Sequence, residues 1–370
     1  MKRRYSRSPN IEIIDDAQHF ASLKEEWEDL YQNSAHATPF QSWAWLYSWW
    51  ESYGEAYELR LIAVRDGDLL VGVIPLMLQR WWNSPGILLF IGTGLTDYLD
   101  ILARKSFEAQ VTKAGTKALM RIGPWKLAAL HELSPEAAAW SLCQKWPGPR
   151  TYVLQKAWQG WQLGCPVIEV KPWDELLMSV STRLRKNARR SLRRAAEDGV
   201  RCVPTGLDEA EQAAQRLVTL HREMLQERGL NPEHLSERFE THVVAAARRM
   251  TASRSGAIYE FWQDGEVVAS HFLLFGNDFV GDYMVGAKPE ALQRYQMHAL
   301  YTWNAVNVAR SRGNARISLL RGEEPYKLRW ASEVIYNYQA VLSRKPTFGS
   351  RNRRGARRPA PHRRRHPGML

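Results

Sequence analysis

The chain has 370 residues, which is enough for two domains with ordinary hydrophobic cores. Its formal net charge is +12, but ten Lys or Arg and no Asp or Glu lie from Arg344 to the C-terminus, which leaves +2 for the rest. The basicity is therefore a property of that segment. Three scattered cysteines without a CxxC pair argue against a disulfide framework and a zinc site. We expect no metal and a reducing, cytoplasmic location.

The sequence carries no recognisable targeting or membrane signal. The opening MKRRYSRSPN is basic, but it runs into IEIIDD rather than into an apolar stretch. The longest apolar run, LLVGVIPLML, is too short to cross a bilayer. We therefore expect neither a secretion signal nor a transmembrane segment.

The first half of the chain alternates predicted strands and helices. Strand patterns cover residues 11–14, the two runs around Asp66-Gly67, residues 87–92 and 125–130, and the neighbourhoods of Tyr152 and Val167; helix patterns cover 20–30, 41–54, 107–120 and the residues after Pro135. The second helix carries four tryptophans, which could stack on sugar rings but are more often core residues. Asp97, Tyr98 and Asp100 cluster beside glycines, a pattern typical of turns that could also contact a substrate.

A basic helix is predicted at the middle of the chain, from Ser181 to Gly199. Leu184, Ala188, Leu192 and Ala195 recur at helical spacing and predict one buried stripe. The other faces carry seven Arg and Lys residues, which repel one another unless solvent or an anionic partner lies alongside. A solvated charged face and a wall facing an anionic substrate both fit, and we favour the second, with Lys186 and Arg190 as substrate contacts.

The second half repeats the order of the first. A strand at 199–204 precedes helices near 208–224 and 235–250, a hairpin about Asp264-Gly265, a strand at 278–287, a helix at 296–312, a strand at 315–320 and a closing strand pair near 335–342. The second Asp-Gly follows the first by 198 residues. An internal duplication of one α/β unit explains this order economically. Beyond residue 345 the composition cannot supply a core, which predicts disorder.

No metal-ligand spacing, nucleophile elbow, GxxxxGK loop or dinucleotide fingerprint occurs. The remaining possibility is chemistry by positioning and proton transfer. The order of elements resembles the GNAT acyltransferase superfamily, and the second half resembles the CelD-like (BcsL-like) acyltransferases associated with cellulose biosynthesis. The resemblance is carried by TPFQSWAWLYSWW, DGDLLVGVIPLML, Asp97-Tyr98, RLRKNARRSLRRAAEDG, DGEVVASHFLLF and GEEPYK, over about residues 10–343.

This resemblance implies tandem GNAT-like domains, each a mixed, mostly antiparallel sheet flanked by helices. We expect a tail at 1–10, a degenerate copy at 11–170, the acyltransferase domain at 171–345 and a disordered Arg-rich tail at 346–370. In the superfamily an acyl-CoA lies between the fourth and fifth strands, here about 279–286 and 315–320, with its pyrophosphate at the N-terminus of the next helix. The resemblance therefore implies acetyl-CoA or another acyl-CoA as donor, bound by Val285, Gly286, Arg294, Gln296 and His298. LQRYQMH stands where the superfamily has a glycine-rich loop.

The resemblance also implies catalytic positions. Tyr326 in GEEPYK stands where GNAT enzymes place a tyrosine near the thioester sulfur, Glu323 or Glu324 could be the base, and Lys327 could hold an anionic or carbonyl group. The same segment could equally be a turn and a helix start, where acidic residues are favoured. His271 and Asp282, on adjacent predicted strands, are weaker base or substrate-binding candidates.

The resemblance implies two candidate functions, and the clustered cations suggest a third. The first is transfer of an acyl group, acetyl above all, to an amine or hydroxyl of a sugar or polysaccharide precursor, as in cellulose or exopolysaccharide biosynthesis. The second is a Fem-like transferase that takes aminoacyl groups from tRNA. The third is a nucleic-acid-binding or scaffolding protein, because clustered cations suffice for phosphate contacts. We expect the Arg-rich tail to bind anionic partners nonspecifically.

Overall fold

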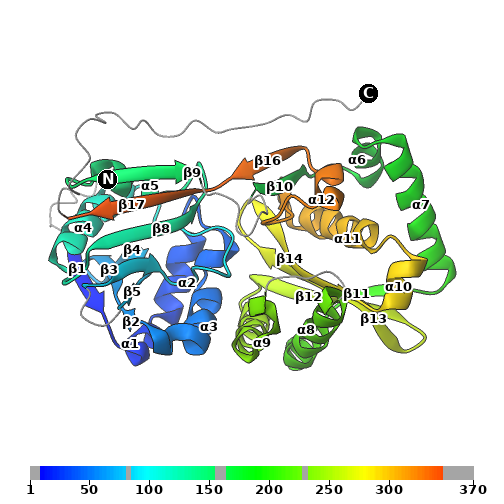
Figure 1. The fold of residues 1–370 in the computed structure, drawn as a ribbon, viewed down its shortest axis with the longest axis horizontal. Coiled ribbons are helices and arrows are strands. Elements are labelled where there is room, and N and C mark those ends of the chain that lie inside the picture. The colour runs from blue at the N-terminus through cyan, green and yellow to red at the C-terminus, as the bar shows by residue number, and fades with distance from the viewer. Residues whose placement is uncertain (1–8, 81–84, 155–163, 227–231, 345–370) are drawn as a thin grey trace. The chain divides into compact units, whose positions relative to one another are not determined.

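The computed structural model describes residues 9–80, 85–154, 164–226 and 232–344, which fold into two compact units. Unit 1 comprises the described parts of Met1–Lys156 and Tyr336–His362, and unit 2 comprises the described part of Ala157–Ile335. Both units combine mostly antiparallel sheets with flanking helices (Figure 1), so the predicted α/β class is confirmed. The predicted N-terminal tail up to residue 8 and the predicted C-terminal tail lie outside the described residues.

Unit 1 contains a four-stranded sheet of order β1-β3-β4-β7 and a six-stranded sheet of order β2-β5-β6-β8-β17-β9. The strands are Asn10–Ile14 (β1), Glu58–Leu59 (β2), Leu61–Asp66 (β3), Leu69–Ile74 (β4), Leu76–Gln79 (β5), Ile87–Phe90 (β6), Leu102–Ala103 (β7), Leu127–Leu133 (β8), Arg150–Leu154 (β9) and Tyr338–Ser343 (β17). The predicted hairpin is β3–β4, where Gly67 adopts a positive φ of 61° that costs glycine little.

The helices of unit 1 supply its aromatic core. They are Ala17–Ser22 (α1), Lys24–Gln32 (α2), Pro39–Gln41 (η1), Trp43–Tyr53 (α3), Gly54–Ala56 (η2), Glu108–Arg121 (α4) and Ala139–Lys145 (α5). Where one helix was predicted over 20–30, two form, because the chain tightens into a short turn at Leu23. Trp43, Trp45 and Trp49 are buried, which supports the interpretation of these tryptophans as core residues.

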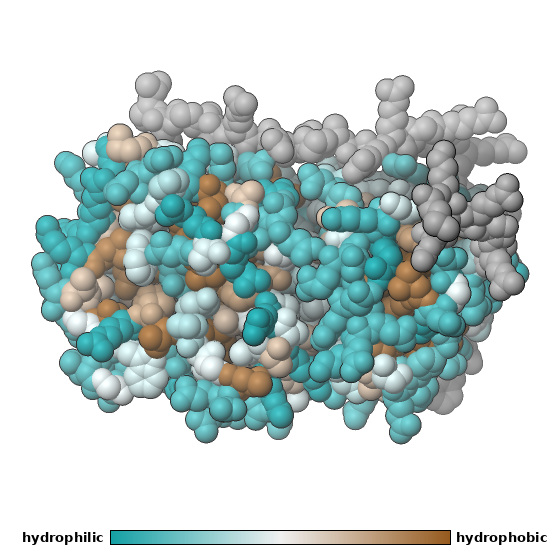
Figure 2. Space-filling view, turned by 180° about the vertical axis from the view of Figure 1, so that it is seen from behind, coloured by the Kyte–Doolittle hydropathy of each residue, from teal (hydrophilic) through white to brown (hydrophobic). Residues whose placement is uncertain are grey.

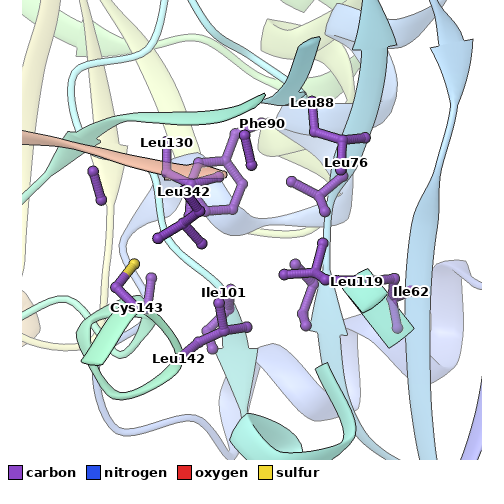
Figure 3. Close-up of a cluster of buried hydrophobic side chains, with 14 of the residues drawn as sticks. Ile62, Leu76, Leu88, Phe90, Ile101, Leu119, Leu130, Leu142, Cys143 and Leu342 are labelled. Carbon is purple, nitrogen blue, oxygen red and sulfur yellow. The ribbon is translucent and has the colours of Figure 1, made fainter. Parts of the chain in front are cut away.

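The last described strand completes the core of unit 1. Leu342 of β17 lies among side chains such as Phe90, Leu130 and Cys143 from the first half of the chain (Figure 3). β17 pairs with β8 on one side and β9 on the other, and Trp146 Nε1 donates to Ser343 O at 2.9 Å. The packing of unit 1 thus depends on residues about 200 positions apart in sequence.

Unit 2 is built on one seven-stranded sheet of order β11-β12-β13-β14-β15-β10-β16. Its strands are Gly164–Glu169 (β10), Arg201–Pro204 (β11), Gly256–Gln263 (β12), Glu266–Phe275 (β13), Phe279–Ala287 (β14), Arg316–Ser318 (β15) and Glu333–Tyr336 (β16). β12 and β13 form the second predicted hairpin, with Asp264 and Gly265 both at positive φ. β14 and β15 are parallel, whereas the strands on the β11 side of β14 pair antiparallel.

Helices cover both faces of this sheet. They are Trp173–Ser179 (α6), Thr182–Glu197 (α7), Leu207–Glu209 (η3), Ala210–Gln226 (α8), Pro232–Leu235 (η4), Glu237–Ala252 (α9), Pro289–Arg294 (α10), Met297–Arg312 (α11) and Pro325–Trp330 (α12). In Figure 1, α8 and α9 lie on one side of β12, and α11 lies on the other. Gly286 allows the close approach of α8, because a Cβ there would come within 2.7 Å of the backbone nitrogen of His221.

The predicted basic helix is α7, and its boundaries follow from the sequence. Ser181 caps it by accepting a hydrogen bond from Leu184 N at 3.3 Å, and Gly199 ends it at a φ of 72°. The stripe is buried at Leu184, Ala188 and Ala195, whereas Leu192 is only partly buried.

Two strand assignments from the sequence need correction. The predicted closing pair near 335–342 is not a pair, since β16 lies beside β10 in unit 2 and β17 lies in unit 1. The strand around Val167, expected with the first half, is β10 and pairs with β15 of unit 2. Alternation of side chains identifies a strand but not its partner. The domain boundaries at 170 and 345 stay predictions.

One face of the molecule and the described helices bear on membrane contact. Figure 2 shows a largely hydrophilic face on which hydrophobic residues form separate patches. Among the described helices, none combines the length and apolar character needed to cross a bilayer.

Candidate active site

The strands β14 and β15 separate after three paired positions. Their last pair is Gly281 with Ser318, and β14 continues to Ala287 without β15 beside it. Past β15, the backbone turns toward β10. Leu319 N donates to Pro166 O, and Gly322 N donates to Gly164 O. We call the region bounded by residues 282–287 and 319–322 the fork.

Leu320 marks a strained point at this fork. Its φ of 58° is unusual for a branched side chain. Its backbone N–H donates to Ser318 Oγ at 3.2 Å, which helps to hold the conformation. Backbone strain of this kind concentrates at binding and catalytic sites.

A chain of three polar side chains ends at the fork. Asn304 Nδ2 of α11 lies 2.9 Å from His271 Nε2 of β13, and His271 Nδ1 lies 3.2 Å from Asp282 Oδ1. In this arrangement the Asn304 amide N–H donates to Nε2 and the N–H on Nδ1 donates to the Asp282 carboxylate. His271 is fully buried, and Asp282 keeps 9% of its side chain exposed. Asp282 is the first residue of β14 beyond its pairing with β15, so this chain orients a carboxylate at the fork.

Aromatic side chains of α11 and α12 lie next to this chain. Tyr301 stacks on His271 at 5.1 Å, and the ring of His298 lies 5.8 Å from that of Tyr326. Burial raises the pKa of Tyr301 well above its ordinary value, and the negative charges of Asp282 and an ionised Tyr326 raise it further. Burial, assisted by Arg329, lowers the pKa of His298. His298, Tyr301 and Asn304 therefore present one face of α11 toward Asp282 and Tyr326.

The segment GEEPYK combines local structure with candidate chemistry. Lys327 Nζ lies 3.1 Å from Glu324 Oε2 and donates to Arg321 O at 2.8 Å, which stabilises the turn before α12. Glu323 is directed toward β10, since a Cβ on Gly164 would come within 2.6 Å of its Oε1. These contacts support the turn interpretation for Glu324 and Lys327, and the catalytic and substrate-binding assignments of Glu323, Glu324 and Lys327 stay predictions.

The predicted phosphate contacts before α11 are engaged within the protein. Arg294 forms a bidentate ion pair with Asp198 at the end of α7, and Tyr295 Oη donates to the same carboxylate at 2.6 Å. The Arg294 hydrogen bond contributes most to holding the Asp198 pKa at about 2, and that of Tyr295 adds to it. The backbone N–H of Gln296 donates to Ser191 Oγ of α7 at 2.9 Å. Arg294 and Gln296 thus attach α7 to the start of α11.

The predicted donor contacts on β14 are also occupied. Val285 O accepts from His221 Nδ1 of α8 at 2.7 Å, and Gly286 O accepts from Tyr301 Oη at 2.8 Å. Both carbonyls lie in the part of β14 that has no β15 beside it. A donor that followed this strand would have to use other backbone groups or displace these side chains.

Lys186 and Arg190 of α7 remain available for an anion. Both are exposed, and within the described part of the chain neither forms a hydrogen bond or ion pair. Arg190 directly precedes Ser191, which caps the backbone before α11. By contrast, Arg189 pairs with Asp174 at 3.1 Å.

Asp97 belongs to unit 1, whereas the other predicted site residues belong to unit 2. It is buried, and its backbone carbonyl accepts from Asn337 Nδ2 at 2.6 Å. This contact gives it a structural role in unit 1, and its assignment as a substrate contact stays a prediction.

Some residues of the site were missed by sequence reasoning. Asn304 is a polar residue on a helix buried on most sides, which is a detectable signal. His221 and His234 lie on separate segments, and only the fold brings His221 Nε2 within 3.1 Å of His234 Nδ1. No cluster of three or more potential metal ligands occurs among the described residues.

A family model supports the acyltransferase interpretation of unit 2. Residues 182–328 match the family described as "Acetyltransferase (GNAT) domain". This range runs from α7 to α12 and contains the fork and the three hydrogen-bonded side chains of Asn304, His271 and Asp282. The chain therefore carries a GNAT acetyltransferase-type domain. No curated protein matches the chain.

Solved structures extend the likeness over both units. FemX shares 10% identity at a TM-score of 0.64, covering 90% of this chain and 96% of its own. A conserved protein of unknown function from Bacteroides thetaiotaomicron shares 11% at 0.57, covering 90% and 100%. L-PGS from Bacillus licheniformis shares 11% at 0.53, covering 88% and 93%. At these identities the likeness concerns the fold alone, and the predicted α/β class, with mixed, mostly antiparallel sheets flanked by helices, is confirmed.

Proposed function

We propose that unit 2 transfers an acyl group, acetyl first, from an acyl-CoA to an amine or hydroxyl of a sugar or polysaccharide precursor. The observation that carries this proposal is the Asn304–His271–Asp282 chain at the fork, facing the same side as Tyr326. Such a transfer requires a base for the acceptor proton and an acid for the leaving thiolate, and positioned carboxylate and phenol groups can serve these roles. The bound donor supplies an acyl group activated as a thioester.

Asp282 is the base in this scheme. It takes one proton from the acceptor while the acceptor nitrogen or oxygen bonds to the acyl carbon and the bond from that carbon to sulfur breaks. His271 and Asn304 hold the carboxylate in place throughout. Tyr326 gives its phenolic proton to the sulfur, and solvent returns the proton from Asp282 to Tyr326. Glu323, on the segment before α12, is the alternative base.

The anionic part of the donor is held by α7 in this proposal. Arg294 is neutralised by Asp198, whereas Lys186 and Arg190 of the same region are exposed and unpaired among the described residues. The start of α11 adds the positive end of its helix dipole. In place of a glycine-rich loop, Lys186 and Arg190 of α7 thus bind the phosphates of the donor in this proposal.

A second candidate is transfer of an aminoacyl group from tRNA, as the resemblance to Fem-type transferases implies. It is supported by the exposed cations of α7, which could contact RNA phosphates. FemX and a lysylphosphatidylglycerol synthetase are among the proteins of similar fold. The reacting atoms would face the same fork, so the two candidates differ in donor rather than in site.

Release of free thiol separates these possibilities. The full chain is incubated with acetyl-CoA and longer acyl-CoAs against glucosamine, other amino sugars and hydroxylated glycans, with aminoacyl-tRNA as a parallel donor. We expect acceptor-dependent thiol release. Transfer from aminoacyl-tRNA alone selects the second candidate, and no transfer from any donor refutes the enzyme proposal in favour of a binding or scaffolding role.

A further inference from the structure

Two histidines outside the Asp282 chain form a second polar array beside the fork. His221 of α8 is buried and donates to Val285 O of β14 at 2.7 Å. His234 of η4 lies with its Nδ1 3.1 Å from His221 Nε2. Arg321 lies at the other side of the fork, and its positive charge contributes to lowering the pKa of His234.

The carbonyl of Val285 determines the proton positions of both rings. A carbonyl oxygen only accepts, so His221 Nδ1 carries a proton. Burial lowers the pKa of His221, so its ring is neutral and Nε2 has a lone pair. His234 Nδ1 must then donate to that lone pair. The Nε2 atom of His234 is left as an acceptor, and it has no hydrogen-bond partner among the described residues.

His234 is held firmly in this orientation. Its ring stacks on buried Phe239 at 4.4 Å, with an angle of 13° between the planes. Arg222 holds the backbone around it through Ser236 O at 3.0 Å and is itself paired with Glu240 at 2.6 Å. His234 remains partly exposed. A lone pair on a fixed ring of a partly exposed residue, beside the proposed reaction site, is suited to binding a hydroxyl or an amine.

We propose that His234 binds the acceptor, its Nε2 accepting a hydrogen bond from a hydroxyl or neutral amine of the acceptor other than the N–H or O–H that gives its proton to Asp282, with His221 as the positioning residue that fixes its tautomer. The proposal rests on the proposed acyl transfer. It assigns the acceptor to the α8 side of β14, whereas Asp282 and Tyr326 act with the α11 side. Because the positive charge of Arg321 repels an ammonium group at this position, the neutral ring of His234 favours a neutral hydroxyl or amine of the acceptor.

The first test needs no substrate. Nitrogen-15 NMR of the histidine side chains reports which ring nitrogen carries the proton. We expect both His221 and His234 as Nδ1–H tautomers between pH 5 and 9, because burial, followed by His221 and Arg321, lowers the pKa of His234 to about 3. An Nε2–H tautomer of His234, or its titration within that range, overturns the proposal.

The second test separates acceptor binding from packing. His234→Phe keeps a ring against Phe239 but removes the acceptor atom, and His234→Gln restores an acceptor on a flexible chain. With acetyl-CoA and glucosamine as probes, we expect His234→Phe to raise the KM for glucosamine about tenfold or more, which corresponds to about 1.4 kcal/mol. The KM for acetyl-CoA should not change, and His234→Gln should recover part of the loss.

The outcomes distinguish this inference from the proposed function. If the wild-type protein transfers and His234→Phe leaves the KM for the acceptor unchanged, the role of His234 fails while the acyltransferase stands. An equal loss in the Phe and Gln variants, with a lowered melting temperature, also overturns it, because it indicates packing alone. If the wild-type protein transfers to no acceptor from any donor, both proposals fail.

Discussion

The two units contain comparable forks that differ in what occupies them. In unit 1, β6 and β8 run parallel through Ile87–Leu127 and Leu88–Ala128 and then separate, as β14 and β15 do in unit 2. The unit 1 chain then returns to its own fork, where Leu99 N donates to Glu132 O at 3.0 Å. No backbone bond of this kind joins the two sides of the unit 2 fork among the described residues.

Side chains follow the same division. Phe90 and Leu130 belong to the hydrophobic cluster of unit 1 (Figure 3), whereas Asp282 of unit 2 ends a hydrogen-bonded polar chain at the fork. Asp100 accepts the backbone N–H groups of Ala138 and Ala139 at 2.6 and 2.8 Å, which fixes the loop of unit 1. The comparison shows how a fork is closed when the chain itself satisfies the groups that a ligand would otherwise meet.

The largest expected effect comes from the carboxylate of the unit 2 fork. Asp282→Asn keeps the size of the side chain but removes the base, so turnover should fall about a thousandfold while the KM for the donor hardly changes. Steady-state kinetics measure this. Asp278→Asn is the control, because Asp278 lies just before β14 and is an exposed partner of Arg316. A loss of equal size there would show that the effect is not specific to Asp282.

The next effect concerns the strand that completes unit 1. Leu342→Ala removes a fully buried side chain from its core and should lower the free energy of unfolding by about 2 to 5 kcal/mol. Chemical denaturation measures the loss. The exposed Val153 of neighbouring β9 is the matched position, and Val153→Ala should cost much less. Equal and small losses at both would mean that β17 adds little to unit 1.

Tyr326→Phe should reduce turnover about a hundredfold or more. The ring is kept, but no proton is available for the leaving thiolate, so donor affinity should not change. Burst and steady-state measurements of thiol release report the chemical step. Glu323→Gln should instead change the alkaline side of the pH profile if Glu323 is the base, with Glu324→Gln as its control. Full turnover in Tyr326→Phe would remove Tyr326 from the mechanism.

Asp100 gives unit 1 a pH dependence. Burial raises its pKa from 3.8 to about 7, despite hydrogen bonds from Ala139, Ala138 and Ile101 that favour the charged form. The folded protein then keeps a proton that the unfolded chain loses, so stability from this group falls as pH rises from about 4 to about 7. Denaturation at several pH values should show this slope in the wild type and not in Asp100→Asn. Identical slopes would contradict the assignment.

The smallest effect on stability is expected on α7. Replacing Lys186 and Arg190 by Gln should change the free energy of unfolding by about 0 to 1 kcal/mol, because both are exposed. Donor binding should weaken, and more at low salt than at high salt. Calorimetric titration with acetyl-CoA measures it. Arg183→Gln, on the same helix, is the control, and unchanged donor affinity in the double variant would leave α7 as a solvated surface.

Much of the architecture could be predicted from local sequence. The hairpins at Asp66-Gly67 and Asp264-Gly265 and the end of α7 at Gly199 require positive φ, which the residue types indicate directly. The pairing of β10 with β15 in unit 2 and of β17 with β8 in unit 1 could not be predicted in this way, because pairing partners far apart in sequence leave no local pattern.

The candidate site divides in the same manner. Asp282 and His271 were identified as residues on adjacent strands, but the role of Asn304 depends on the position of α11 over β13. Arg294 had the right chemistry for a phosphate, yet Asp198, 96 residues earlier, neutralises it. Residue type therefore predicts what a side chain can do, and only the fold shows which partner it has.

Hydrogen exchange with and without acetyl-CoA tests the central claim most directly. The full chain is labelled in both states, and the protection of peptides from the two forks is compared by mass spectrometry. We predict that acetyl-CoA protects residues 279–287 and 316–328 of unit 2 and leaves residues 87–103 of unit 1 unchanged. Protection confined to unit 1, or no protection in either fork at a saturating concentration, would contradict the assignment of the unit 2 fork as the donor site.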